Sequence, residues 1–130
     1  MEFEIMFDHM PEYVLIRTYG EASAQGFDNL LTTLVNSPEW VVGTRQLVDH
    51  RKLSAKHLTN DDMQKIENIS KKYGEQLGGG HVAFVVSNKV SFGMIRMYEL
   101  LGGENTHSEI RIFYSINEAA AWLKQYNQTA

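Results

Sequence analysis

The residues that could do chemistry in this chain are histidines, hydroxyls, lysines and carboxylates, because the sequence contains no cysteine. Its histidines are scattered: His9, His50, His57, His81 and His107. No two of them have the i, i+4 spacing of a helical metal site, and neither an H-E-x-x-H nor a G-x-S-x-G motif occurs. The triplet Gly78-Gly79-Gly80 precedes a predicted strand, so we interpret it as a helix stop, not a phosphate loop. These patterns predict no catalytic residue, no cofactor and no metal.

Positive charge gathers in the segment 50–58, HRKLSAKHL, which contains no carboxylate. It follows a short predicted strand at 46–49, and ligand crevices in open α/β sheets lie at the carboxyl ends of strands. We interpret this segment as a basic loop that contacts an anionic surface, a phosphate-bearing ligand or a protein partner. The alternative is a solvated loop whose leucines pack on the core. The candidate contact residues are Arg51, Lys52, Leu53, Lys56 and Leu58.

The predicted helix at 91–101 is apolar over much of its circumference. Its expected core stripe is Phe92, Ile95, Tyr98 and Leu101. Met94 and Met97 extend the apolar arc beyond that stripe, so the helix is either deeply buried or offers a second face. That face would suit a homodimer partner, a membrane or an apolar ligand, because methionine adapts to varied surfaces. Core filling is an equal alternative. The candidate contact residues here are Phe92, Met94, Arg96 and Met97.

Strands and helices alternate along the chain in a way that predicts how these segments are positioned. Hydrophobic periodicity places strands at 3–8, 13–19, 46–49, 81–86 and 109–114. It places helices at 23–36, 59–77, 91–101 and 115–126, with Thr59 as an N-cap. The order β-β-α-β-α-β-α-β-α predicts an α/β domain with an N-terminal hairpin and a mostly parallel sheet of four to five strands, packed by about four helices. We expect residues 1–130 to form one domain.

Composition excludes several classes of protein. The chain has 130 residues, is 43% hydrophobic and carries a formal net charge of -4, which is typical of a globular domain and argues against a nucleic-acid-binding protein. No apolar run approaches the roughly 18 residues of a membrane span, and the acidic N-terminus does not read as a signal peptide. We therefore expect a cytoplasmic protein.

Several segments resemble the SpoIIAA-like (STAS/SEC14-type) family of small bacterial proteins, and the resemblance covers nearly the whole chain. Its most specific part is 92–99, FGMIRMYE, which is similar to that family's Phe-Gly-x-x-Arg-Met-aromatic helix. Three more segments agree: Val48-Asp49 with Arg51, the apolar run 82–86, and 118–123, EAAAWL. The resemblance implies a four- or five-stranded sheet packed by helices.

For function, the resemblance implies a non-enzymatic regulatory or scaffolding module that acts by protein–protein interaction. The alternative, from similarity to lipid-binding CRAL-TRIO domains, is binding of an apolar ligand with peripheral membrane association. STAS domains are often switched by phosphorylation of a serine that opens a helix. This chain lacks the Asp-Ser-Ser-Gly pattern; the corresponding helix start reads Thr59-Asn60-Asp61-Asp62, where carboxylates oppose an added phosphate. Ser54 and Thr59 are the candidate phosphorylation sites, and Thr59 is more simply an N-cap.

Overall fold

One five-stranded sheet organises the chain. The computed structural model describes residues 1–102 and 109–128. The strands are β1 (Glu2–Met6), β2 (Val14–Glu21), β3 (Gln46–Ser54), β4 (Val82–Val85) and β5 (Ile110–Phe113), and they lie in the sheet in that order. β1 pairs antiparallel with β2, and the other neighbours are parallel. The predicted α/β class, hairpin and mostly parallel sheet are therefore confirmed.

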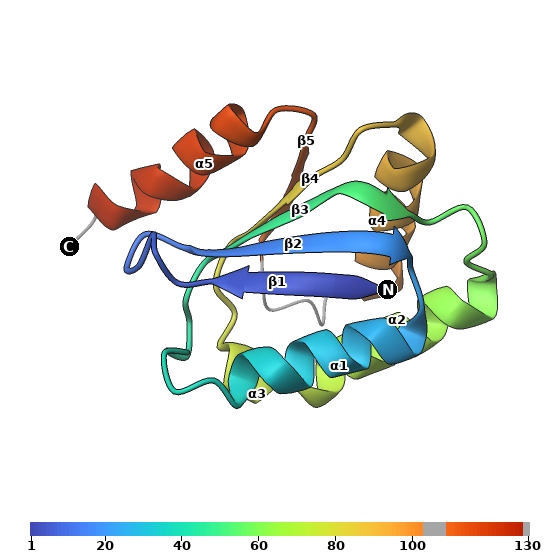
Figure 1. Cartoon of the computed structure of the whole chain (residues 1–130), viewed down its shortest axis with the longest axis horizontal. Coiled ribbons are helices and arrows are strands. Elements are labelled where there is room, and N and C mark those ends of the chain that lie inside the picture. The colour runs from blue at the N-terminus through green and yellow to red at the C-terminus, as the bar shows by residue number, and fades with distance from the viewer. Residues whose placement is uncertain (103–108, 129–130) are drawn as a thin grey trace.

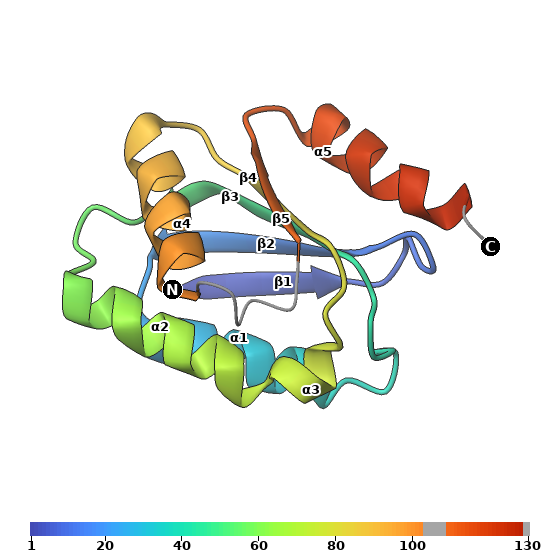
Figure 2. The same cartoon turned by 180° about the vertical axis from the view of Figure 1, so that it is seen from behind.

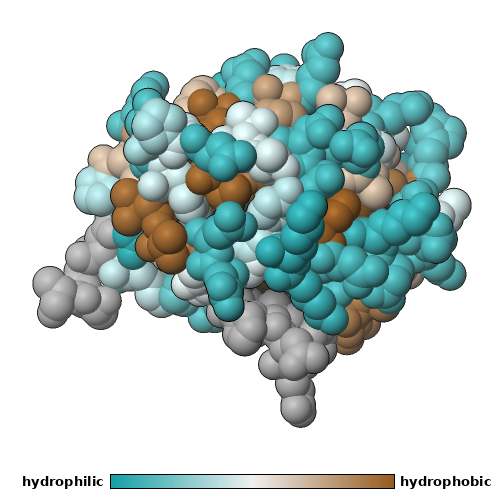
Figure 3. Space-filling view, turned by 90° about the horizontal axis from the view of Figure 1, so that it is seen from below, coloured by the Kyte–Doolittle hydropathy of each residue, from teal (hydrophilic) through white to brown (hydrophobic). Residues whose placement is uncertain are grey.

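Helices cover both faces of this sheet. They are α1 (Ala24–Val35), α2 (Asn60–Lys72), α3 (Gly74–Leu77), α4 (Lys89–Gly102) and α5 (Ile116–Lys124), followed by a 3-10 turn at Gln125–Gln128. α1, α2 and α3 lie on one side of the sheet and α5 on the other, while α4 stands beside α2 (Figures 1 and 2). Seen from the side of α1 and α2, the surface is mostly hydrophilic, and hydrophobic residues show as separate patches (Figure 3).

Side-chain alternation along the central strands produces two hydrophobic cores. Val14, Ile16 and Val48 belong to the core beneath α1, whereas Leu15 and Leu47 belong to the core beneath α5. Because successive residues of a strand point to opposite faces, a strand covered on both sides is apolar throughout. This burial on both faces is what the continuous apolar runs of the sequence indicated.

Helix starts follow local capping chemistry. Ser23 Oγ accepts a hydrogen bond from the Gly26 N–H at 2.9 Å and so caps α1. Thr59 caps α2 as predicted, because its Oγ1 accepts the Asp62 N–H. The Asp62 carboxylate in turn accepts the Thr59 N–H, which completes a capping box. α2 ends earlier than the predicted helix 59–77, at Lys72, and a separate turn, α3, precedes the glycine triplet.

The predicted strand at 46–49 was too short, and the predicted basic loop at 50–58 was wrong over its first half. β3 continues to Ser54, with Lys52 paired to Tyr19 and Leu53 paired to Gly20 after an irregularity in register. Leu53 is buried, so it belongs to the interior and not to an exposed loop. β2 supplies a long parallel partner, and this non-local pairing overrides the loop-like composition of the segment.

The structure also corrects the predicted core stripe of the fourth helix. Ile95 is buried and Tyr98 is half-buried, but Leu101 has 38% of its surface exposed and does not reach the core. α4 begins at Lys89, with Asn88 Oδ1 accepting from the Ser91 N–H at 2.9 Å. Over the described parts of the chain, no helix is both long and apolar enough to cross a membrane.

Candidate functional site

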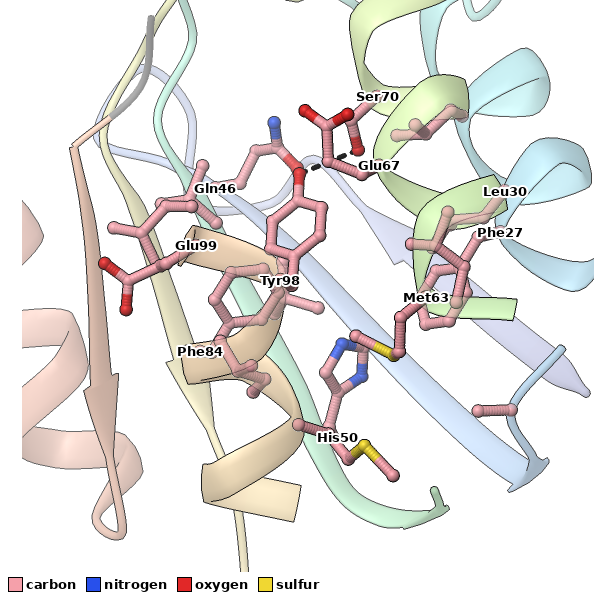
Figure 4. A pocket seen from close by; sticks show the side chains of 18 of the residues that line it. Phe27, Leu30, Gln46, His50, Met63, Glu67, Ser70, Phe84, Tyr98 and Glu99 are labelled. Carbon is pink, nitrogen blue, oxygen red and sulfur yellow. Dashed lines mark hydrogen bonds between the residues drawn. The ribbon is translucent and has the colours of Figure 1, made fainter. Parts of the chain in front are cut away.

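A pocket of about 530 Å³ lies between the sheet and helices α1, α2 and α4 (Figure 4). Its volume falls within the range of small-molecule sites, which is roughly 300–1,000 Å³. Apolar side chains form most of its wall and come from all four sources: Ile16, Val48 and Phe84 from the sheet, Phe27 and Leu30 from α1, Met63 and Ile66 from α2, and Met94 and Ile95 from α4. Leu53 also lines the pocket, which therefore extends to the carboxyl end of β3, where α/β sheets commonly bind ligands.

His50 lies in the wall of this pocket beside two aromatic rings. The Phe84 ring stacks on it with centroids 5.4 Å apart, and the Phe27 ring meets it edge-on at 5.8 Å. Burial lowers the pKa of His50 to about 4, although the charge of neighbouring Asp49 acts in the opposite direction. The imidazole is therefore neutral near pH 7.

The contacts of Thr18 indicate which nitrogen of His50 carries the proton. Thr18 Oγ1 lies 3.2 Å from the Asp49 carbonyl oxygen, to which it donates, and 2.6 Å from His50 Nδ1. A hydroxyl has only one proton to give, and Thr18 gives it to the Asp49 carbonyl, so we assign the proton of His50 to Nδ1, which donates to Thr18. Nε2 is then an unprotonated acceptor, and it forms no hydrogen bond with any residue that the structure describes.

Glu67 on α2 brings a buried carboxylate to the same pocket. The residue is 4% exposed, and its Oε2 has neither solvent contact nor a hydrogen bond from the described residues. Lys71 Nζ lies 3.2 Å from Oε2, but without hydrogen-bonding geometry, and the Lys71 side chain is 49% exposed. A buried oxygen that lacks a hydrogen bond is costly, so this atom is suited to accept one from a ligand.

Tyr98 joins α4 to α2 across one side of the pocket. Its hydroxyl donates to Ser70 Oγ at 2.7 Å, beside Glu67 in Figure 4. Burial raises the pKa of Tyr98, and the nearby charge of Glu67 adds to this, while the hydrogen bond to Ser70 opposes it. The phenol therefore keeps its proton and holds the two helices together.

Arg51, a predicted contact residue, is engaged by its own chain. Its side chain donates twice to the Asp49 carboxylate, both at 2.9 Å, and its backbone N–H donates once at 3.1 Å. Burial alone would raise the pKa of Asp49, but the hydrogen bonds from Arg51 outweigh it and lower the pKa. Arg17 lies 3.8 Å from the same carboxylate. We therefore interpret the Arg51–Asp49 pair as a structural contact that stabilises β3.

The structure separates the other predicted contact residues into two groups. Those that line the pocket are Leu53, Leu58 and Met94. Those outside it are Lys52, Lys56, Phe92, Arg96 and Met97. In the outer group, Lys52 lies over the Tyr19 ring at 5.9 Å, Phe92 stacks on Tyr114, and Arg96 lies 3.4 Å from Glu99. The predicted contact residues therefore do not all line one pocket.

Neither predicted phosphorylation site lies in the wall of the pocket. Ser54 is half-buried at the end of β3, where it pairs with Glu21. Thr59 is exposed, and its Oγ1 accepts the Asp62 N–H at 3.1 Å. No three His, Asp or Glu side chains in the described ranges are grouped to hold a metal ion, and His107 lies outside those ranges.

Sequence reasoning missed Glu67, which is the most informative polar residue of the pocket. A signal was present, because Glu67 and Ser70 follow Met63 at helical spacings of four and seven and therefore lie on the same face of the helix as this apolar residue. A carboxylate at such a position is rarely buried without a partner. The pairing of His50 with Thr18 has no local signal in the sequence, because it joins residues of two different strands.

Comparison with known proteins agrees with this architecture. The chain matches no protein-family model and no curated protein. It is similar to the crystal structure of a DUF3478-family protein with a SpoIIAA-like fold from Shewanella loihica PV-4, with a TM-score of 0.62 and 15% sequence identity. The similarity covers 94% of this chain and 92% of that chain. The fold that the sequence resemblance implied is thereby confirmed: the chain has a SpoIIAA-like fold.

Proposed function

We propose that this protein is a non-enzymatic binding module whose ligand is a small, mainly apolar molecule held in the pocket between the sheet, α2 and α4. The observation that carries the proposal is an apolar wall around about 530 Å³. Two acceptors without hydrogen bonds from the described residues, His50 Nε2 and Glu67 Oε2, interrupt this wall. Ligand sites typically combine an apolar lining with a few such polar groups.

A larger side chain in the wall of the pocket should leave less volume for the ligand and weaken its binding. Met94 lines it from α4, and Met94→Trp places a larger ring there, so we expect the affinity for the neutral fluorophore N-phenyl-1-naphthylamine to fall at least about tenfold. Fluorescence titration measures this. Met97→Trp is the matched control, because Met97 lies three residues away on the same helix and does not line the pocket. Unchanged binding by a folded Met94→Trp variant would contradict the proposal.

The outer side of α4 supports a second candidate function, which is protein contact. Val90, Met97, Leu100 and Leu101 are exposed there, with Leu100 81% exposed. Clustered exposed apolar residues often mark interaction surfaces. Because the same helix lines the pocket, a ligand that repositions α4 would also change this outer surface, which would make the module regulatory. Protein partner, homodimer and peripheral membrane contact are the occupants predicted from the sequence.

The homodimer is the occupant that is most simply measured. We expect Leu100→Asp to reduce self-association at this surface, because an added carboxylate would be desolvated between two copies. Light scattering of wild type and variant across a concentration series reports the mass directly. A wild-type protein that is monomeric at every concentration would contradict the homodimer hypothesis and would not affect the pocket proposal.

A further inference from the structure

We infer that the ligand carries a hydrogen-bond donor, a protonated amine or a hydroxyl, on its apolar body, and that carboxylic acids are disfavoured. This inference rests on the proposed function and names the chemical class of ligand. The two pocket atoms without hydrogen bonds from the described residues, Glu67 Oε2 and His50 Nε2, are both acceptors.

Glu67 provides the negatively charged acceptor. Its carboxylate is buried among the apolar residues of α2 that line the pocket, and Oε2 has no hydrogen bond from the described residues. The approach of Lys71 to 3.2 Å balances part of the charge without supplying that bond. Because Oε2 has no solvent contact in this structure, a ligand donor reaches it when the Glu67 side chain turns toward the pocket. The two groups would then form a charge-assisted hydrogen bond, which is stronger than a bond between neutral groups.

His50 provides the second acceptor through a chain of hydrogen bonds. The Asp49 carbonyl accepts a hydrogen bond from the Thr18 hydroxyl, Thr18 accepts one from the Nδ1–H of His50, and Nε2 keeps its lone pair. Phe27 and Phe84 hold the ring in place. In Figure 4, Glu67 and His50 lie at separate parts of the pocket, with Met63 nearer to His50. A ligand with one donor satisfies one acceptor, and a ligand with two donors can satisfy both.

The charged groups around the pocket disfavour a carboxylate ligand. Among the described lining residues, the only lysine or arginine is Lys71, which already faces Glu67. Glu67 and Glu99 are two lining carboxylates, and Arg96 lies beside Glu99 at 3.4 Å without lining the pocket. An anionic head group would therefore be desolvated close to like charges and without a free cation to pair with.

The test compares three ligands of equal chain length: dodecylamine, dodecanol and dodecanoic acid. Each displaces N-phenyl-1-naphthylamine from wild-type protein at pH 7.5, below its aggregation concentration. We expect the amine to bind most tightly, the alcohol next and the acid at least about tenfold more weakly than the amine, which is the size of one charge-assisted hydrogen bond. Equal affinities for amine and acid would overturn the inference.

Glu67→Gln tests whether Glu67 is the group that favours the amine over the acid. The substitution keeps the size of the side chain and removes its charge, so we expect amine affinity to fall about tenfold, alcohol affinity to fall by less and acid affinity to rise. Asp61→Asn is the matched control, since Asp61 lies on the same helix and pairs with Lys65 at 3.1 Å through the same i, i+4 spacing, but its side chain is 77% exposed. We expect no change in ligand affinity for this control.

Failure of this inference is distinguishable from failure of the proposed function. Unchanged amine binding by a Glu67→Gln variant that still binds N-phenyl-1-naphthylamine normally would remove the donor inference and leave the pocket in place. A wild-type protein that binds neither the fluorophore nor any of the three ligands would overturn both. If the variant no longer binds the fluorophore, circular dichroism shows whether it is folded; Glu67→Met then tests the loss of the acceptor, and amine binding that persists in it overturns the inference.

Discussion

Acidification from pH 7 to pH 4.5 should remove about 2.5 kcal/mol of the unfolding free energy through His50 alone, since one unit of pKa difference corresponds to about 1.36 kcal/mol. The ring is buried and hydrogen-bonded to Thr18 in the folded chain, where burial lowers its pKa to about 4. In the unfolded chain, the ring is solvated and its pKa is the ordinary value of about 6.5.

The direction of this pH effect follows from whether the folded or the unfolded state binds the proton. Between pH 6.5 and pH 4 the unfolded state binds a proton on His50 that the folded state does not bind, so protonation favours unfolding. The contribution of His50 is fully present above about pH 6.5, decreases as the pH falls, and levels off below about pH 4. This is the reverse of a histidine whose pKa is raised by a partner in the folded state.

Urea unfolding of wild type and His50→Phe at pH 7.0, 5.5 and 4.5 isolates this effect. The phenyl ring retains the aromatic contacts with Phe27 and Phe84 and has no proton to gain, while Thr18 keeps its bond to the Asp49 carbonyl. We expect the variant to lose about 2.5 kcal/mol less than wild type over this range. Equal losses would show that His50 is not held neutral, and NMR titration of its ring resonances would give the same answer independently.

Gly78→Ala is expected to be the most damaging of the small glycine substitutions. Gly78 has a φ of +80°, a left-handed conformation that costs alanine roughly 1–2 kcal/mol. A Cβ built there would also lie 2.5 Å from the Gly43 backbone nitrogen and 2.5 Å from Val42 Cγ1, so backbone must move. We therefore expect a loss of about 2–4 kcal/mol in unfolding free energy, measured by urea unfolding.

Gly74→Ala is the matched control for that experiment. Gly74 begins α3, its φ is not positive, and a Cβ at this position meets no atom within 4 Å. Alanine is the better helix former and restricts the unfolded chain, so a gain of about 0.4–1 kcal/mol is expected. If both variants lost stability equally, the special geometry of Gly78 would not be the cause.

Local patterns in the sequence were sufficient to predict most of the fold. Alternation in Phe3, Ile5 and Phe7 indicated the first strand of the hairpin, and the predicted cap Thr59 precedes a helix that the structure contains. Each of these signals acts within a few residues, through side-chain period or a cap, so the sequence displays it directly. The glycine triplet likewise stops a helix, with Gly78 as its left-handed cap.

The length of β3 was not predictable in the same way. The segment Arg51-Lys52 looks like a loop because it is charged, yet it continues the strand because β2 offers a parallel partner beyond the irregularity near Arg17. Leu53 is buried by the same pairing. A strand's end is decided by its neighbour, and no local residue pattern reports where that neighbour ends.

The α/β class and the order of the strands and main helices follow from local patterns along the chain, and the printed sequence lacks the common catalytic and metal motifs. That Glu67 and His50, from a helix and a strand, lie in the wall of one pocket follows from the packing of distant segments. The physical reason is that a cavity is the space left where α2 and α4 pack against the sheet. That space depends on contacts between distant segments, whereas periodicity and capping depend on residues only a few positions apart.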